Sequence, residues 1–109
     1  MDTAAGVLAS RPPQVTGTKA VRVEIKGRVQ GVGFRDWTME NAQELGLCGW
    51  VRNRRNGSVE ALFSGDSASV EEIVEKRCRI GPPAAAVTAV ASFPSDEDPG
   101  QGFECRFTL

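Results

Sequence analysis

A short glycine-rich segment of the chain has the composition of an anion-binding turn. Its nine residues, 27–35, read Gly-Arg-Val-Gln-Gly-Val-Gly-Phe-Arg and lie between an alternating apolar pattern and a helical one. Glycines let a backbone turn sharply, so that several N–H groups point into one concavity, which binds tetrahedral anions beside a helix N-terminus. The nucleotide-binding P-loop has a different spacing and ends in Lys-Ser/Thr, which this segment lacks. The segment is therefore either an anion-binding turn or a tight connection that needs flexible residues.

Arg35 falls at the end of this segment, in the first turn of the predicted helix. A cation there faces the positive end of the helix dipole, which disfavours it unless an anion is bound in front of the helix. A guanidinium group fits the oxygens of a phosphate bidentately. Arg35 therefore either holds a phosphate or forms a surface salt bridge with Asp36 or Glu40. Arg28 could also approach the anion, or it could remain a solvated charge at a strand end.

Asn53 is the second candidate for chemistry, and it directly precedes an Arg-Arg-Asn-Gly turn at residues 54–57. A side-chain amide can accept a hydrogen bond from water and donate another, and so can orient a nucleophile without acting as a base. Asparagines at such positions also commonly serve the turn itself. The chain has no histidine, so the commonest general base is missing. Any chemistry must then rest on positioning and electrostatics.

The three cysteines, Cys48, Cys78 and Cys105, are interpreted as packing residues. No histidine is present to activate a thiol, and no close pair has the spacing of a zinc site. Reduced thiols in a cytoplasmic protein are the simpler interpretation, although a disulfide between two of them is left open. We expect no metal and no cofactor. The carboxylates gather on the second predicted helix and at residues 95–98, away from the presumed anion site.

The elements that would position these residues follow from the periodicity of the chain. Val21, Val23 and Ile25 alternate with polar residues, which predicts a strand before the glycine-rich segment. From Phe34 the pattern is that of a helix, which Gly46 ends. Further strands are predicted at 49–53, 58–64, 87–93 and 103–107, and a second helix begins near Asp66 or Ser67 and ends before 81–83.

This order predicts an α+β sandwich. Both helices would cover one face of a mostly antiparallel sheet of four or five strands, in the order β-α-β-β-α-β with a terminal strand added. The 109 residues, 40% of them hydrophobic, fit one domain, expected at 20–109. Residues 1–19 have few large apolar side chains and are expected to form a disordered tail, with an organellar targeting peptide as the alternative. No run approaches the ~18 apolar residues of a membrane span.

The distribution of charge suggests where an anionic ligand would bind. Thirteen basic and fourteen acidic residues give a net charge of −1, which argues against nucleic acid as a partner. Residues 20–55 carry seven Lys/Arg against four Asp/Glu, a net +3, whereas residues 56–109 carry four against nine, a net −5. The first half of the chain is therefore the expected location of an anion site.

Taken together, these residues resemble the acylphosphatase family. Segment 27–35 is similar to the phosphate-binding signature of that family, including its Phe-Arg ending. Residues 45–47, 49–53 and 56–61 also match in register, as does a later stretch from 81 to 90. The resemblance covers residues 20–109. Position 56 is asparagine where aspartate is common in the family, which leaves the turn chemistry intact.

The resemblance implies a ferredoxin-like sandwich that hydrolyses small acyl phosphates to a carboxylate and inorganic phosphate without a metal. By motif, Arg35 binds the phosphate, Asn53 orients the attacking water, and backbone amides form a cradle. The expected cradle residues are Gln30, Gly31, Val32, Gly33 and Phe34. We expect a cytoplasmic monomer with no nucleic-acid or membrane partner. The alternatives are a non-catalytic phosphate- or phosphoprotein-binding module and a ferredoxin-like RNA-binding domain, and a turnover assay with an aryl acyl phosphate separates the first from an enzyme.

Overall fold

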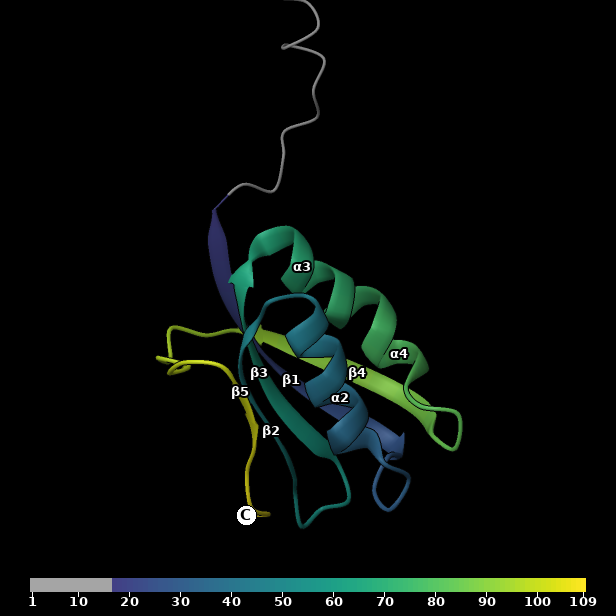
Figure 1. Cartoon of the computed structure of the whole chain (residues 1–109). Helices are drawn as coiled ribbons and strands as arrows, with labels where there is room; N and C mark the ends of the chain where they lie inside the picture. Colours follow the sequence, from purple (N-terminus) through teal and green to yellow (C-terminus); the bar gives the residue numbers. More distant parts are fainter. Residues whose placement is uncertain (1–16) are drawn as a thin grey trace, which may run out of the picture.

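The computed structural model describes residues 17–109, which form a five-stranded sheet with two helices packed on one face (Figure 1). The sheet order is β4-β1-β3-β2-β5, and neighbouring strands are antiparallel except for β2 and β5, which run parallel. The predicted α+β order, with both helices on one face, is confirmed. The strands are β1 (Thr18–Arg28), β2 (Cys48–Asn53), β3 (Val59–Asp66), β4 (Ala86–Pro94) and β5 (Phe103–Cys105). The helices are α2 (Phe34–Glu44) and α3 (Ser67–Glu72), the latter continuing through a π-helical turn, η1 (Ile73–Arg77), into α4 (Cys78–Ile80).

The core lies between the sheet and the helices. Its largest fully buried side chains come from β1, β2, β3 and both helices: Val23, Ile25, Val51, Val59, Phe63, Phe34, Val70, Ile73 and Cys78. Successive side chains of a strand point to opposite faces of the sheet. Asn53 follows Val51 by two residues at the end of β2, so it lies on the same face as the helices. This alternation places Asn53 on the side of the sheet where α2 begins.

β1 begins at Thr18, two residues earlier than the expected domain boundary. Thr18 pairs with Asp66 of β3, and the carbonyl oxygen of Gly17 accepts a hydrogen bond from the Ser67 amide at 3.1 Å. The Lys19 ammonium is 2.8 Å from a Glu71 carboxylate oxygen. The sheet extends this far because β3 itself continues to Asp66 and offers pairing partners. The rest of the expected tail, residues 1–16, lies outside the described residues.

The first turn of α2 is fixed against the sheet by aromatic packing. Phe34 is fully buried and its ring centroid lies 5.3 Å from that of Trp37. Thr38 and Ala42 continue the same buried stripe along the helix. The helix ends at Glu44, and Gly46 terminates it as predicted, with a φ of 72° and a backbone hydrogen-bond pattern typical of a helix C-terminus. Because Phe34 is packed in the core, the backbone position of its neighbour Arg35 is fixed as well.

A buried carboxylate on the other face of the sheet holds the end of β2. Glu60 accepts hydrogen bonds from Arg52 Nε at 2.9 Å, Arg54 Nη1 at 2.8 Å and Arg22 Nη1 at 3.1 Å. Arg52 and Arg54 flank Asn53 in sequence, so their anchoring on this face directs Asn53 to the opposite one. Burial alone raises the pKa of Glu60, but the hydrogen bonds from Arg54 and Arg52 outweigh it, and the pKa lies below its ordinary value of 4.5.

Glu60→Gln is expected to lower the free energy of unfolding at neutral pH by about 2 kcal/mol, the scale of charge-assisted hydrogen bonds. Because the folded pKa of Glu60 is depressed, its contribution is fully present above the ordinary value of 4.5 and is lost as the pH falls through the lower folded value. Urea unfolding at neutral pH and at acidic pH checks this. The difference between the wild type and the variant should shrink in acid, and a difference independent of pH would contradict the ionic role of Glu60.

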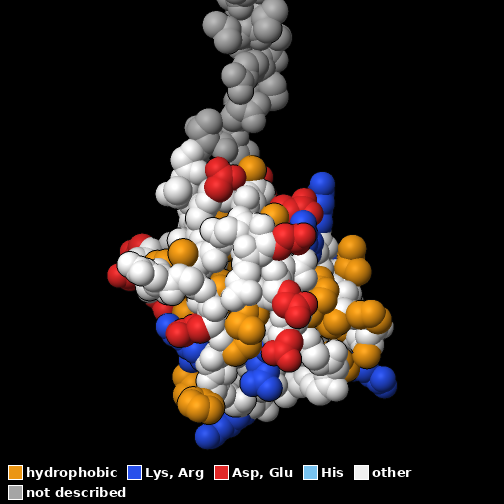
Figure 2. All heavy atoms as spheres, in the orientation of Figure 1, with side chains coloured by type: hydrophobic (Ala, Val, Ile, Leu, Met, Phe, Trp, Pro, Cys, Tyr) orange, Lys and Arg blue, Asp and Glu red, His pale blue; other side chains and the backbone are white. Residues whose placement is uncertain are grey.

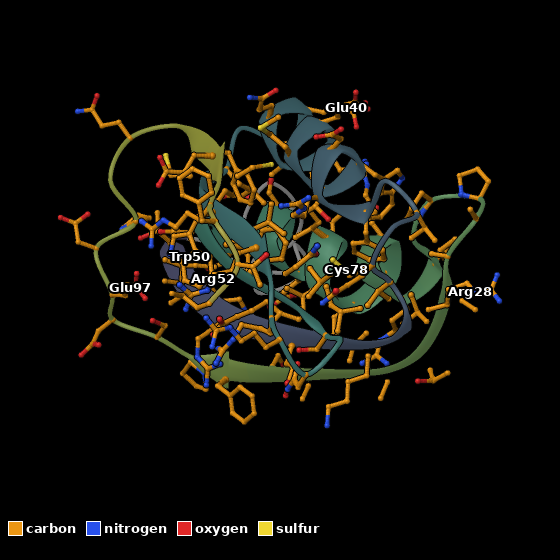
Figure 3. The ribbon with its side chains drawn as sticks, turned by 90° about the horizontal axis from the view of Figure 1, so that it is seen from below. Arg28, Glu40, Trp50, Arg52, Cys78 and Glu97 are labelled. Carbon is orange, nitrogen blue, oxygen red and sulfur yellow. The ribbon has the colours of Figure 1, made fainter. Side chains whose placement is uncertain are left out.

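Trp50 lies on the same face of β2 and contacts Glu97, in the acidic segment at residues 95–98. Its indole N–H donates to a Glu97 carboxylate oxygen at 3.1 Å, and its ring lies under the guanidinium groups of Arg52 and Arg106, at 4.7 and 4.9 Å. Figure 3 shows Trp50, Arg52 and Glu97 grouped together. This stacking buries the ring and holds the segment after β5 against β2.

In the described part of the chain, no helix is long and apolar enough to cross a membrane.

Candidate active site

A small pocket lies where the loop after β1, the start of α2 and the end of β2 meet. Its volume is about 100 Å³. The residues that line it are Val29, Gly31, Gly33, Phe34, Arg35, Asp36 and Asn53. The two side chains that the sequence singled out for chemistry, Arg35 and Asn53, therefore border the same space.

The loop reaches this geometry through two glycines in the left-handed backbone region. Gly31 has φ 73° and Gly33 has φ 81°, a conformation that side-chain-bearing residues rarely adopt. Gly33 is the N-cap of α2, and its carbonyl oxygen accepts from the Trp37 amide at 3.0 Å. Within residues 17–109, the backbone amides of 31–36 donate to no other group. A row of unpaired N–H groups at the positive end of a helix attracts an anion.

Arg35 is exposed and available to a ligand. Among the described residues it forms no ion pair, so the alternative of a salt bridge to Asp36 or Glu40 is not seen there. Glu40 projects outward from α2 in Figure 3. Arg28 also points outward at the edge of the molecule in that view and is not among the pocket-lining residues. Of the arginines in the glycine-rich segment, Arg35 is the one that the structure places at the pocket.

The side chain of Asn53 is not used by the hairpin turn that follows it. That role belongs to Asn56, whose Oδ1 accepts from the Ser58 amide at 3.0 Å and from the Ser58 hydroxyl at 2.6 Å. The backbone of Asn53 pairs with Val59, and its side-chain amide has no hydrogen-bond partner within residues 17–109. The amide is thus free to contact a water molecule or a ligand in the pocket.

Gln30 has a role that the sequence did not indicate. Its side-chain nitrogen donates to the carbonyl oxygens of Arg54 at 2.7 Å and Ser58 at 2.9 Å, which ties the glycine-rich loop to the hairpin beside Asn53. Of the five expected cradle residues, Gly31, Gly33 and Phe34 line the pocket, whereas Gln30 and Val32 do not. No periodicity marks such a bond across the fold, because it joins two loops that are distant in sequence.

Asp36 also lines the pocket, and sequence analysis missed it. We expected the carboxylates to lie away from the anion site, but Asp36 follows Arg35 directly and sits in the first turn of α2, where the helix dipole favours an anion. The adjacency to Arg35 was the signal that could have revealed it. The pocket therefore combines one cation with one carboxylate at its border.

The cysteines lie outside the pocket lining, and all three are free thiols. Burial raises the pKa of Cys78 to about 12, so this thiol is protonated at neutral pH. Burial and the nearby Asp36 carboxylate raise the pKa of Cys105. In the part of the chain that the structure describes, no three His, Cys, Asp or Glu side chains come together as metal ligands.

Basic and acidic side chains are mixed on the face of the molecule that Figure 2 shows. Basic side chains occur at the lower end, where Figure 1 places the loop after β1 and the β2–β3 hairpin, and also at the upper right. Acidic side chains are spread over the middle and upper part.

Fold and site together define a small ferredoxin-like domain with a pocket at the start of helix α2. A family model described as Acylphosphatase matches residues 21–105, which include the whole pocket. The chain belongs to the acylphosphatase family.

Relatives and solved structures agree with this assignment. An acylphosphatase of Nitrobacter hamburgensis is 60% identical over 73 residues, 67% of this chain and 73% of that protein. One of Rhizorhabdus wittichii is 49% identical over 104 residues, 93% of this chain and 97% of that protein. The structure of an acylphosphatase from Coxiella burnetii is 35% identical with a TM-score of 0.78, covering 82% of this chain and 93% of the other.

Proposed function

We propose that this chain hydrolyses the carboxyl–phosphate anhydride bond of small acyl phosphates, giving a carboxylate and inorganic phosphate by direct attack of water. The observation that carries the proposal is the pocket bordered by Arg35, the two glycines of the loop and Asn53. Membership of the acylphosphatase family supports the same reaction. The substrate is a small molecule, and we propose that the enzyme acts as a cytoplasmic monomer.

In this proposal the phosphate is held by charge and by backbone dipoles. Arg35 contacts two phosphate oxygens, and amides of the cradle segment, Gln30, Gly31, Val32, Gly33 and Phe34, donate to the others. Phosphoryl transfer asks the protein mainly to position the reactants and to stabilise negative charge on the equatorial oxygens. The unpaired amides and the free guanidinium group are suited to that task. Gln30 contributes in a second way, because its side chain holds the loop next to Asn53.

The attacking water is oriented by Asn53. The water oxygen forms a new bond to phosphorus while the bond from phosphorus to the carboxyl oxygen breaks, and the carboxylate leaves with the electron pair. A carboxylate is a weak base, so its departure needs no general acid. The proton of the water passes to a phosphate oxygen, since the chain has no histidine to receive it.

A turnover assay with an aryl acyl phosphate tests the proposal directly. We expect release of inorganic phosphate and the matching carboxylate, with inorganic phosphate acting as a competitive inhibitor. Binding of phosphate at the pocket without any hydrolysis would instead identify a phosphate-binding module, and the proposed reaction would be wrong.

Turnover is expected to be independent of divalent metal ions, because Arg35 and the loop amides supply the positive charge that a metal provides in other phosphoryl-transfer enzymes. Protein that has been treated with a chelator and dialysed should keep its full kcat, and added Mg²⁺ or Zn²⁺ should not raise it. A loss of activity that a divalent ion restores would contradict this prediction.

Asp36→Asn is expected to strengthen phosphate binding by about two- to fivefold, because it removes a negative charge at the border of an anion site. The inhibition constant of inorganic phosphate measures the change, which should diminish as the ionic strength rises. Glu40→Gln is the matched control, since it removes the same charge one turn later on α2, outside the pocket. Equal effects of the two variants would show that Asp36 has no special relation to the phosphate. A large fall in kcat in Asp36→Asn would show instead that Asp36 receives the proton.

A further inference from the structure

Two loops that are distant in the chain meet at the pocket, and one side chain joins them. The glycine-rich loop follows β1, and the β2–β3 hairpin begins directly after Asn53; both lie at the same end of the sheet (Figure 1). The half-buried Gln30 crosses from the loop to the hairpin, where its Nε2 atom donates to the carbonyl oxygens of Arg54 at 2.7 Å and Ser58 at 2.9 Å. We call these two hydrogen bonds the Gln30 bridge. Within residues 17–109, no other hydrogen bond joins the two loops.

The Gln30 bridge matches the chemistry of the two carbonyl groups that close the hairpin. The Ser58 carbonyl oxygen accepts from the Arg54 amide at 2.9 Å, and the Arg54 carbonyl oxygen accepts from the Gly57 amide at 3.1 Å. A carbonyl oxygen can accept twice, and the nitrogen of a side-chain amide carries two hydrogens. Gln30 therefore gives one hydrogen to the second acceptor position of each carbonyl group. An apolar side chain or a carboxylate of the same length has no hydrogen to give them.

Arg54 is held on both sides of the chain. Its guanidinium group donates to Glu60 at 2.8 Å on the helix-free face, and its carbonyl oxygen accepts from Gln30. The side chain of Asn53, the residue before it, has no hydrogen-bond partner within residues 17–109, so its position depends on how its neighbour is held. At the other end of the bridge, Gly31 directly follows Gln30. Each end of the Gln30 bridge is thus one residue away from a residue that lines the pocket.

We propose that Gln30 is a positioning residue for the hydrolysis, whose bridge sets the place of Asn53 relative to the bound phosphate and thereby controls kcat. Phosphate affinity is left to Arg35 and the loop amides. The inference rests on the proposed function, because kcat has a meaning only if an acyl phosphate is hydrolysed. The Gln30 side chain does not line the pocket and acts on the attacking water through Arg54 and Asn53.

Gln30→Leu removes both hydrogen bonds and keeps a side chain of similar size. We expect kcat to fall about tenfold, because a misplaced nucleophile slows the chemical step, while the inhibition constant of inorganic phosphate changes by less than about twofold. Gln30→Glu keeps the shape of the side chain and offers no hydrogen at neutral pH, so it should lose at least as much kcat. A merely structural role would instead lower the melting temperature and leave kcat unchanged well below that temperature.

A double-mutant cycle tests whether Gln30 acts through Asn53. When Asn53 is already replaced by alanine, adding Gln30→Leu should change kcat by less than about twofold, because the group that the bridge positions is gone. Losses that multiply in the double variant would show that Gln30 affects the reaction by another route, and would overturn the inference.

Asn56→Ala is the matched control within the same hairpin. It removes the bonds to the Ser58 amide at 3.0 Å and to the Ser58 hydroxyl at 2.6 Å and leaves the Gln30 bridge in place. It should lower the melting temperature and keep kcat within about twofold of the wild type.

Three results would overturn the inference: full kcat in both Gln30 variants, an equal loss of kcat in Asn56→Ala, or Gln30 variants that no longer fold by circular dichroism. The last would make Gln30 a residue of the fold alone. Failure of the proposed function has a different signature, namely wild-type protein that binds phosphate but hydrolyses no acyl phosphate.

Discussion

Arg35→Gln is expected to abolish detectable turnover and to weaken the binding of inorganic phosphate by about tenfold or more. Among the described residues, Arg35 is the one cationic side chain that lines the pocket, and the substitution removes the charge proposed to hold the phosphate in both the ground state and the transition state. Phosphate affinity can be measured by calorimetry, and turnover with an aryl acyl phosphate. Loss of both properties in a folded protein is the expected result.

Arg28→Gln is the matched control for this experiment. Arg28 belongs to the same glycine-rich segment and carries the same charge, but it points outward and does not line the pocket. Its replacement should change phosphate affinity only slightly, through the screened field of the surface. If Arg35→Gln binds phosphate as the wild type does, the anion site lies elsewhere and the proposed arrangement is wrong.

Asn53→Ala is expected to lower kcat by about 100-fold or more while phosphate affinity stays within a few-fold of the wild type. The substitution removes only the groups that orient the water, and misplacement of a nucleophile acts on this scale. The contrast with Arg35→Gln is informative, because one variant loses binding and chemistry and the other loses chemistry alone. Steady-state kinetics and the inhibition constant of phosphate provide the two measurements.

Asn56→Ala serves as the control for the role of Asn53. Asn56 is the asparagine that holds the turn, through its bonds to Ser58, so its loss should lower the melting temperature more than it lowers kcat. Near-full turnover in Asn53→Ala would falsify the water-positioning role. Circular dichroism on every variant separates such an outcome from unfolding.

The sequence predicted the parts of the fold that depend on local patterns. Alternation identified β1, the helical period identified α2, and the Asn-Gly turn placed the hairpin that follows Asn53. The features that it did not predict depend on contacts between distant residues. The π-helical turn at Ile73–Arg77 leaves the helical spacing of the apolar residues unchanged, so that spacing does not reveal it. The early start of β1 at Thr18 follows from the length of its partner β3.

In the candidate site too, the sequence predicted what depends on residue type and missed what depends on contacts between distant residues. Arg35 and Asn53 could be chosen from chemistry and resemblance, since their side-chain types suit phosphate and water, and both line the pocket. The bonds of Gln30 to the hairpin could not be predicted, because nothing local distinguishes a glutamine that crosses between two loops from one in solvent. The parallel pairing of β5 with β2 could not be predicted either, because no local pattern specifies which strand a neighbour in the sheet will be.

The direction of β1 determines how this domain can be attached to other molecules. β1 has 11 residues and spans roughly 33 Å, with Thr18 at one end of the sheet and Arg28, next to the pocket loop, at the other. A carrier protein or a solid support joined through the amino end of β1 is therefore held far from the pocket, whereas one joined after Leu109, whose carbonyl oxygen accepts from the Arg55 amide, lies near the end of β2 that borders the pocket (Figure 1). Immobilisation through the amino end leaves the mouth of the pocket open to diffusing substrate.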